Sequence, residues 1–160
     1  MTSSRIERTL LAVKPCAVQR GLIGEVITRI ERRGLKIIAM KMKMLTPELL
    51  KRHYSHLVDK PFYPLIEASM MAAPVVLMCI EGVEAVRVVR AMAGDTNGRN
   101  ALPGTIRGDY CVSGQENIVH SSDSLETAEK ELNRFFQQED YMEYDSPLVK
   151  FIYADDELSS

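Results

Sequence analysis

The chain has 160 residues, of which 46% are hydrophobic and 26% are charged, a composition typical of one soluble globular domain. The formal net charge of −2 gives no overall basic field, so nucleic acid is not expected as the main partner. Three scattered cysteines without a CxxC pair favour a reducing compartment, and no apolar run approaches the roughly 18 residues of a membrane span.

We therefore expect a cytoplasmic protein with no membrane segment, since the charged amino-terminal stretch lacks the apolar core of a signal peptide. A single domain is expected over residues 1–160, and its acidic tail, from about residue 138 to 160, is expected to be irregular.

Segments with the apolar spacing of strands and of helices alternate along the chain. In chain order they predict a strand at 8–13, a helix at 22–30, a strand at 35–44, a helical insert at 47–54 and after 61, a strand at 74–80, a helix at 83–92, a strand at 117–120 and a helix at 125–136. Gly34 is expected to end the first helix, Thr46 to begin the insert, and Asp123 or Ser124 to cap the last helix, with Asp123 and Glu126 as a capping box. Residues 94–116 lack periodicity and carry five glycines, and loops of that length are usually functional.

This order of elements contains no hairpin-length connection between strands. It is typical of a ferredoxin-like βαββαβ sandwich, an α/β (α+β) fold with a four-stranded antiparallel sheet, here carrying a helical insert. A doubly wound sheet is the alternative, but four strands make it less suitable.

A phosphate site in this chain would need cationic side chains, because no GxxxxGK[ST] loop occurs. The segment 21–24, with glycine at both ends, is a weak phosphate-loop candidate and better suits the start of a helix. Lys14 at a strand end, Arg90 on a helix and Arg107 between loop glycines are the candidates. Guanidinium groups bind phosphate oxygens bidentately, although most lysines and arginines are solvated surface charges.

Three other features have simpler explanations. His53 and His56 are three residues apart on an expected helix, but no neighbouring cysteine or carboxylate completes a metal site, so packing or surface roles are favoured. The methionines at 40, 42 and 44 are expected to fill a core edge. Phe62 either stacks on a base or anchors the insert.

Of the candidate residues, His120 has the sequence surroundings that most favour a catalytic role. It leaves a short strand just before a helix, and imidazole can act as acid, base, ligand or nucleophile. Glu131 lies at the margin of the last helix's apolar face, where a carboxylate needs a hydrogen-bond partner. If that helix folds back on the strand, Glu131 can accept an N–H from His120. The pattern alone leaves a catalytic and a structural histidine equally open.

Taken together, ten segments resemble the nucleoside diphosphate kinase family along nearly the whole chain. They are 7–10 (ERTL), 13–15 (VKP), 18–25 (VQRGLIGE), 60–62 (KPF), 74–76 (PVV), 81–82 (EG), 94–97 (GDTN), 103–109 (PGTIRGD), 117–120 (NIVH) and 122–124 (SDS). Each segment is weak alone, but their order and spacing argue against chance agreement.

The resemblance implies ping-pong transfer of a γ-phosphate from a nucleoside triphosphate such as ATP to a nucleoside diphosphate. His120 would be the nucleophile through Nδ1, with Glu131 on its other ring nitrogen. By position in the family, Lys14, Arg90, Thr96 and Arg107 would contact phosphates, Tyr54 would position the Lys14 region, Asn117 would bind the sugar, and Phe62 would stack on the base. Mg²⁺ would be held mainly by the phosphates. The resemblance also implies a homo-oligomer, and a chain that continues to Tyr153 suits a hexamer better than a tetramer.

Three positions depart from the family pattern. Cys16 replaces the usual Asp or Asn and would remove a helix cap, Ser121 replaces Gly and would crowd the backbone, and Gly98 replaces Pro and would loosen the loop. A catalytically silent nucleotide-binding homologue therefore stays open. An RNA-binding module is the other alternative, which the acidic charge and the missing aromatic RNP pattern disfavour.

Overall fold

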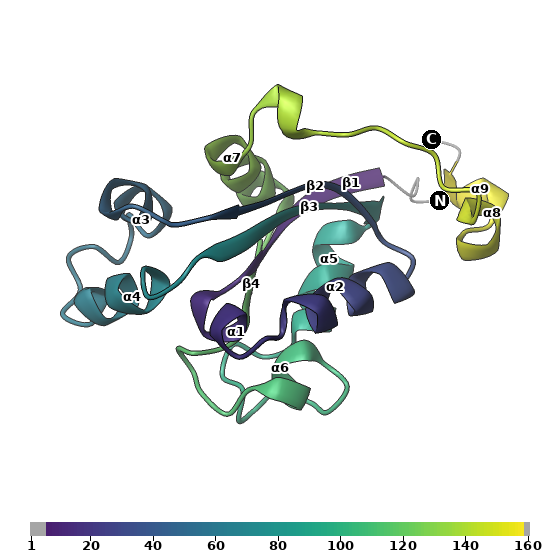
Figure 1. Cartoon of the computed structure of the whole chain (residues 1–160). Helices are drawn as coiled ribbons and strands as arrows, with labels where there is room; N and C mark the ends of the chain where they lie inside the picture. Colours follow the sequence, from purple (N-terminus) through teal and green to yellow (C-terminus); the bar gives the residue numbers. More distant parts are fainter. Residues whose placement is uncertain (1–5, 159–160) are drawn as a thin grey trace.

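The computed structural model describes residues 6–158 and contains a four-stranded sheet in the order β2-β3-β1-β4 (Figure 1). Every neighbouring pair is antiparallel, which confirms the ferredoxin-like sandwich and excludes the doubly wound alternative. The strands are β1 (Ile6–Val13), β2 (Lys36–Lys43), β3 (Val75–Val83) and β4 (Val119–Ser121). Within these described residues, no helix is both long and apolar enough to cross a bilayer.

Helices cover both faces of this sheet, and a helical insert lies at one end (Figure 1). They are α1 (Pro15–Gln19), α2 (Ile23–Arg32), α3 (Pro47–His53), α4 (Tyr63–Met70), α5 (Ala85–Ala93), α6 (Ile106–Tyr110), α7 (Leu125–Phe135), the 3₁₀ turn η1 (Gln138–Asp140), α8 (Val149–Ile152) and α9 (Asp155–Leu158). Figure 1 shows α2 and α5 on one face and α7 on the other.

Successive side chains of β1 point to opposite faces of the sheet, so the core has two halves. Leu11 and Val13 pack with α2 and α5, whereas Leu10 and Ala12 pack with the insert and α7. All four are 0–4% exposed, and most of β3 is buried as well. A central strand with both faces covered has to be apolar throughout, which is why these runs were recognisable in the sequence.

Pairing of β4 with β1 creates the geometry on which the site depends. His120 lies opposite Ala12, Val119 lies opposite Val13, and the Lys14 N–H donates to the Ile118 oxygen at 2.8 Å. The carboxyl end of β1 and the amino end of β4 therefore meet at one edge, together with the loop that precedes β4.

Helix boundaries follow the predicted signals at some ends and differ at others. Thr46 accepts from the Leu49 N–H, as expected for an N-cap. At α7 the cap is Ser124, which accepts from the Thr127 N–H, so the capping box expected at Asp123 was wrong by one residue. Val83 ends β3 and does not begin a helix.

Two short helices in the part of the chain before the tail were not predicted, α1 and α6. Pro15 ends the β1 ladder, but it also occupies the first position of α1, where proline's missing N–H has no cost. The long loop contains α6, which Thr105 caps by accepting from the Gly108 N–H.

The methionines on β2 were expected at a core edge, and this was wrong. Met40, Met42 and Met44 are 56%, 59% and 50% exposed. Met40 and Met42 alternate along the edge strand β2 and Met44 follows directly after it, so the three side chains share one face.

Gly98 is buried in the long loop and held by a hydrogen bond. Its N–H donates to the Ser113 oxygen at 3.0 Å, and a Cβ there would lie 2.6 Å from the Cys111 oxygen. Proline, usual in the family at this position, lacks this N–H and needs that space. The surroundings of residue 98 in this structure therefore suit glycine and not proline.

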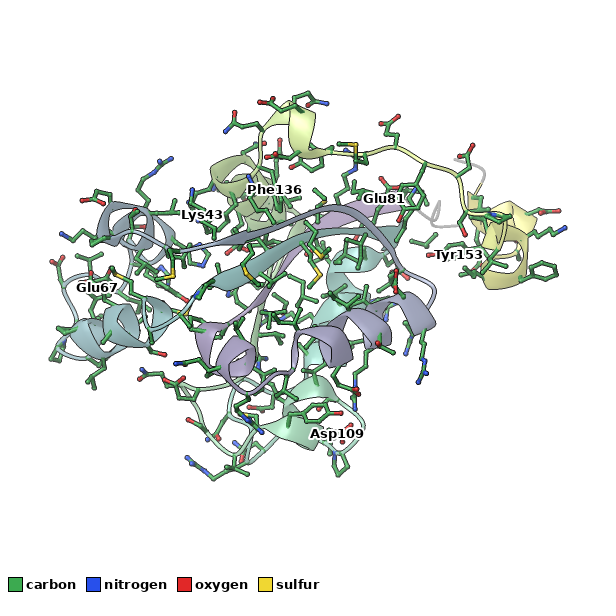
Figure 2. All side chains as sticks on the ribbon, in the orientation of Figure 1. Lys43, Glu67, Glu81, Asp109, Phe136 and Tyr153 are labelled. Atoms are coloured by element: carbon green, nitrogen blue, oxygen red, sulfur yellow. The ribbon has the colours of Figure 1, made fainter. Side chains whose placement is uncertain are left out.

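The tail beyond η1 follows the β2–β3 end of the sheet and contains short helical turns where an irregular segment was expected. The Met142 N–H donates to the Ile38 oxygen at 2.7 Å, and the Tyr144 hydroxyl donates to the Ile37 oxygen at 2.8 Å. The Tyr153 hydroxyl accepts from the Val83 N–H at 3.2 Å, and Figure 2 labels this tyrosine beside the end of the sheet.

We predict that Gly108→Ala destabilises the fold, because the added Cβ would collide with the Leu102 backbone, which cannot yield as a flexible side chain does. Overpacking of this kind costs about 1–3 kcal/mol of unfolding free energy. Gly24→Ala is the matched control, since a Cβ on Gly24 in α2 meets nothing within 4 Å. Denaturant unfolding of both variants measures the difference, and equal midpoints would contradict it.

Candidate active site

A cavity of about 740 Å³ opens where the β1–β4 edge, the helical insert, α5, the long loop and α7 meet. Every residue that the sequence put forward for the site lines it. They are Lys14, Tyr54, Phe62, Arg90, Thr96, Arg107, Asn117, His120 and Glu131. The structure thus brings together groups that lie up to 117 positions apart in the chain.

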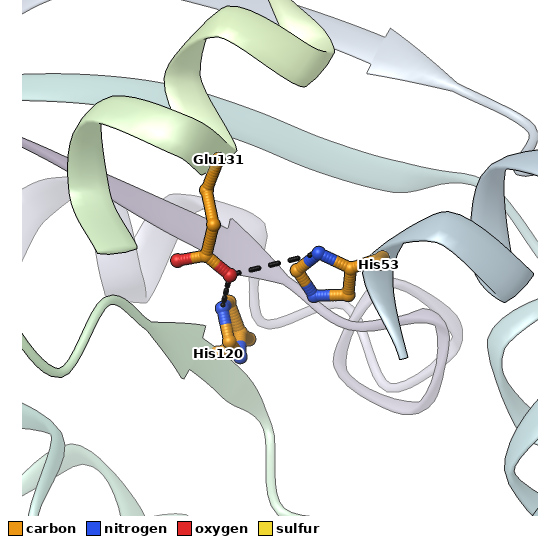
Figure 3. A group of neighbouring side chains, drawn as sticks. All are labelled: His53, His120 and Glu131. Carbon is orange, nitrogen blue, oxygen red and sulfur yellow. Dashed lines mark hydrogen bonds and ion pairs between the residues drawn. The ribbon is translucent and has the colours of Figure 1, made fainter. Parts of the chain in front are cut away.

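His120 lies on β4 with its side chain 27% exposed, and α7 folds back over it as expected. Its Nε2 is 2.6 Å from Glu131 Oε2, and the Ser122 hydroxyl donates to Glu131 Oε1 at 2.6 Å (Figure 3). Both carboxylate oxygens of a residue that is only 4% exposed therefore have partners.

The charge state of Glu131 determines which nitrogen of His120 carries the proton. Burial alone would raise the pKa of Glu131, but the hydrogen bonds from His120 and Ser122 outweigh it and hold this pKa below its ordinary value. A charged carboxylate only accepts, so Nε2 carries the N–H. The lone pair of the neutral ring is then on Nδ1, which Figure 3 shows turned away from Glu131.

His53, expected in a packing or surface role, is part of this cluster. Its side chain is 6% exposed, its Nδ1 lies 3.6 Å from Glu131 Oε2, and its ring meets that of His120 edge-on at 4.9 Å. His53 does have the expected packing role, but the expectation that no carboxylate lies nearby was wrong, because Glu131 comes from a helix 78 residues further along. His56 lies in the turn after α3 and does not share a helix with His53.

His53, His120 and Glu131 are close enough to suggest a metal site. The donor set does not suit one, because Arg134 Nη1 donates to His53 Nδ1 at 2.8 Å and places a positive charge there. Glu131 Oε2 is likewise engaged with His120.

Lys14 and Asn117 form a buried polar network at the strand edge. Lys14 Nζ donates to the Gln115 oxygen at 2.6 Å and to Asn117 Oδ1 at 2.8 Å. The Asn117 amide donates in turn to the Thr96 oxygen at 2.9 Å and to the Gly114 oxygen at 3.1 Å. Burial lowers the pKa of Lys14 from its ordinary value, so this ammonium gains from an added anion.

Arg107 is a buried cation held by main-chain oxygens. Its guanidinium, on a residue 7% exposed, donates to the oxygens of Asn117 at 3.1 Å, Gly94 at 2.8 Å and Val119 at 2.7 Å. Burial lowers the pKa of Arg107. Between Asn117 and Val119, Ile118 has φ +73°, a conformation that costs a β-branched residue of order 1–3 kcal/mol.

The remaining predicted residues lie around the cavity. Phe62 is 45% exposed at the start of α4, so it is not a buried anchor of the insert. Arg90 on α5 and Thr96 in the loop are exposed. Burial raises the pKa of Tyr54 to about 12, and within residues 6–158 its hydroxyl forms no hydrogen bond with Lys14.

Two departures from the family pattern fit their surroundings. Ser121 continues the β4 ladder opposite Leu11, 6% exposed and without a positive φ, so its Cβ is accommodated. Cys16 is the second residue of α1, whose N-cap is Lys14, so position 16 is not the expected cap. The glycines at 21 and 24, considered as a phosphate loop, do not line the cavity.

Comparison with known proteins gives one consistent result. The family model for nucleoside diphosphate kinase matches residues 7–141. A nucleoside diphosphate kinase of Parabacteroides distasonis is 56% identical over 96% of this chain and all of its own length. Nucleoside diphosphate kinase B of Bos taurus is 47% identical over 92% of this chain and 97% of its own.

Solved structures of nucleoside diphosphate kinases are similar to this chain as well. A halophilic nucleoside diphosphate kinase from Halobacterium salinarum, in complex with CDP, is similar with a TM-score of 0.90 and 38% identity, covering 94% of this chain and all of that one. A nucleoside diphosphate kinase family protein from Babesia bovis is similar with a TM-score of 0.88 and 40% identity, and the match covers 92% of this chain and 99% of that one. Fold, cavity and sequence together show that this chain belongs to the nucleoside diphosphate kinase family.

Proposed function

We propose that the protein, a phosphotransferase by family, moves the γ-phosphate of a nucleoside triphosphate to a nucleoside diphosphate through phosphorylated His120. The observation that carries this proposal is the 2.6 Å contact between His120 Nε2 and the buried, charged Glu131. It leaves the Nδ1 lone pair of a half-buried ring as the available nucleophile.

In the first half-reaction, Nδ1 attacks the γ-phosphorus, the bond to the β–γ bridging oxygen breaks, and the diphosphate leaves with that electron pair. The proton stays on Nε2, and the positive charge that develops on the ring is stabilised by Glu131. In the second half-reaction, a β-phosphate oxygen of another diphosphate attacks the phosphorus, and the electron pair of the N–P bond returns to Nδ1.

The other residues bind and orient the nucleotide. Lys14, Arg90, Thr96 and Arg107 contact the phosphates, Asn117 contacts the sugar, Phe62 stacks on the base, and Tyr54 positions the Lys14 region. Their common cavity supports these roles. Phosphoryl transfer needs mainly positioning and charge stabilisation, and a positioned arginine can contribute about 10³-fold or more. Stacking on Phe62, worth ~1–3 kcal/mol, accepts any base and favours broad nucleotide specificity.

Mg²⁺ neutralises charge on the phosphate oxygens when it accompanies the nucleotide. Among the described residues that line the cavity, Asp123 and Glu131 are the carboxylates, and Glu131 already accepts two hydrogen bonds. Octahedral coordination by protein groups alone is therefore not available, which supports Mg²⁺ held mainly by the phosphates.

We also propose a cytoplasmic homo-oligomer with six subunits. Unpaired cysteines suit a reducing compartment. The exposed methionines of β2, together with Leu148 and Phe151 of the tail at 57% and 76% exposure, are apolar surface of the kind found at subunit contacts.

Wild-type protein incubated with γ-labelled ATP is predicted to become an acid-labile, base-stable phosphoprotein. His120→Ala should lose this label, whereas His56→Ala should keep it, because His56 is exposed in the turn after α3. A chase with unlabelled diphosphate should recover the label in triphosphate. An unlabelled wild type that still binds nucleotide would instead support the silent homologue.

Glu131→Gln is predicted to lower the single-turnover rate by about 10²–10⁴-fold, because a neutral amide neither fixes the tautomer nor stabilises the developing charge. Ser122→Ala should cost less rate but about 1–3 kcal/mol of stability, because it leaves Oε1 buried without a donor. The folded-state pKa of Glu131 is depressed, so its contribution is present at neutral pH and is lost as pH falls through that pKa. Ser122→Ala raises this pKa, and acid unfolding should begin at higher pH. An unchanged acid midpoint would contradict this.

Light scattering should give a mass six times the 18.0 kDa of one chain. Met42→Lys, which places a charge in the exposed β2 row, should shift the population to smaller species. A monomeric wild type at micromolar concentration would overturn the oligomer.

A further inference from the structure

We propose that Arg134 is a positioning residue that holds His53 neutral, with its proton on Nε2, and so reserves Glu131 for His120. This inference rests on the proposed phosphotransfer through His120. It concerns a residue that neither the sequence patterns nor the family resemblance singled out.

The first step is the tautomer of His53. Arg134 lies on α7 three residues after Glu131, and its Nη1 is 2.8 Å from His53 Nδ1. A guanidinium has donors only and remains charged at any ordinary pH, so Nδ1 must accept with its lone pair. The proton of the neutral ring is then on Nε2.

The second step concerns Glu131. His53 Nδ1 is 3.6 Å from the same Oε2 atom that accepts from His120 Nε2 at 2.6 Å. A protonated Nδ1 would be a second donor next to that oxygen and would compete for it. With Arg134 bound to Nδ1, this competition is removed, and the orientation of His120 is left to Glu131.

The third step is electrostatic. Burial, foremost, lowers the pKa of His53 to about 3, and the charges of His120, Arg134 and His56 act in the same direction, while Glu131 opposes them. These groups face His53 from β4, from α7 and from the turn after α3, and the rings of Tyr54 and Phe135 complete its surroundings.

The consequence is a role for Arg134 in the pH range of the site. Without this donor and this charge, His53 Nδ1 can carry a proton and pair with Glu131. His120 then shares with His53 the carboxylate that orients it. A smaller fraction of the protein therefore has His120 with a free Nδ1 lone pair in position to attack. Arg134 therefore keeps the site competent on the acid side of neutrality.

The test compares Arg134→Leu with Lys130→Leu, a matched control that removes a cation from the same helix one turn earlier. Lys130 is exposed and pairs with Glu126. The rate of His120 labelling from γ-labelled ATP is measured in a single turnover from pH 5 to 8. For Arg134→Leu the acid limb should move to higher pH, with about a tenfold loss of rate at pH 5.5. Lys130→Leu should follow wild type.

Nitrogen-15 NMR of the unphosphorylated protein reads the tautomer without turnover. Wild-type His53 should show Nε2–H and no titration between pH 5 and 8, whereas in Arg134→Leu an Nδ1–H form should appear and the pKa of His53 should rise. Adding His53→Gln to Arg134→Leu should return the acid limb to the wild-type position, because glutamine does not titrate.

An Nδ1–H tautomer in wild type, or an Arg134→Leu profile identical to that of Lys130→Leu, would overturn the proposal. Should Arg134→Leu fail to fold, Arg134→Gln keeps an N–H donor without the charge, and the NMR readout decides. If wild type takes no label at all, the phosphotransfer function fails, while the tautomer measurement still tests the role of Arg134.

Discussion

The buried carboxylate of Glu131 is the constraint to which the rest of the site conforms. A charge that is only 4% exposed is tolerated only with hydrogen-bond partners, and here His120 and Ser122 supply them. These two contacts fix α7 against β4 and select the tautomer of the histidine. Because one group both secures the packing and prepares the nucleophile, its loss affects stability and chemistry together.

Two buried cations, Arg107 and Lys14, line the same cavity as this carboxylate. Arg107 uses main-chain oxygens as its partners and so holds the loop against β4 around the strained Ile118. Lys14 is held by Gln115 and Asn117. Neutral oxygens satisfy their hydrogen bonds but leave their charges uncompensated. An anionic phosphate group is the ligand that would compensate these charges, which supports the proposed substrates on physical grounds.

The same dependence on hydrogen-bond partners applies to His53 and Arg134, which lie next to His120 and Glu131. The ring packs against His120, and the guanidinium holds its Nδ1. The departures at Cys16, Gly98 and Ser121 have milder consequences than expected, because each residue fits its local backbone. The proposal of a silent homologue therefore gains no structural support from Ser121.

The sequence by itself determined the strands, the main helices, the inward position of Glu131 and nine of the residues that line the cavity, because these follow from local periodicity and from recognisable family segments. It missed α1 and α6, which are too short to show a period. It also missed the polar neighbours of His53 and misplaced the methionines at 40, 42 and 44. Only the tertiary structure decided those, because the partners of His53 lie 78 and 81 positions away and the exposure of Met42 depends on which strand forms the sheet edge. Periodicity reports which face of an element is apolar, whereas a contact between distant elements exists only once the chain has packed.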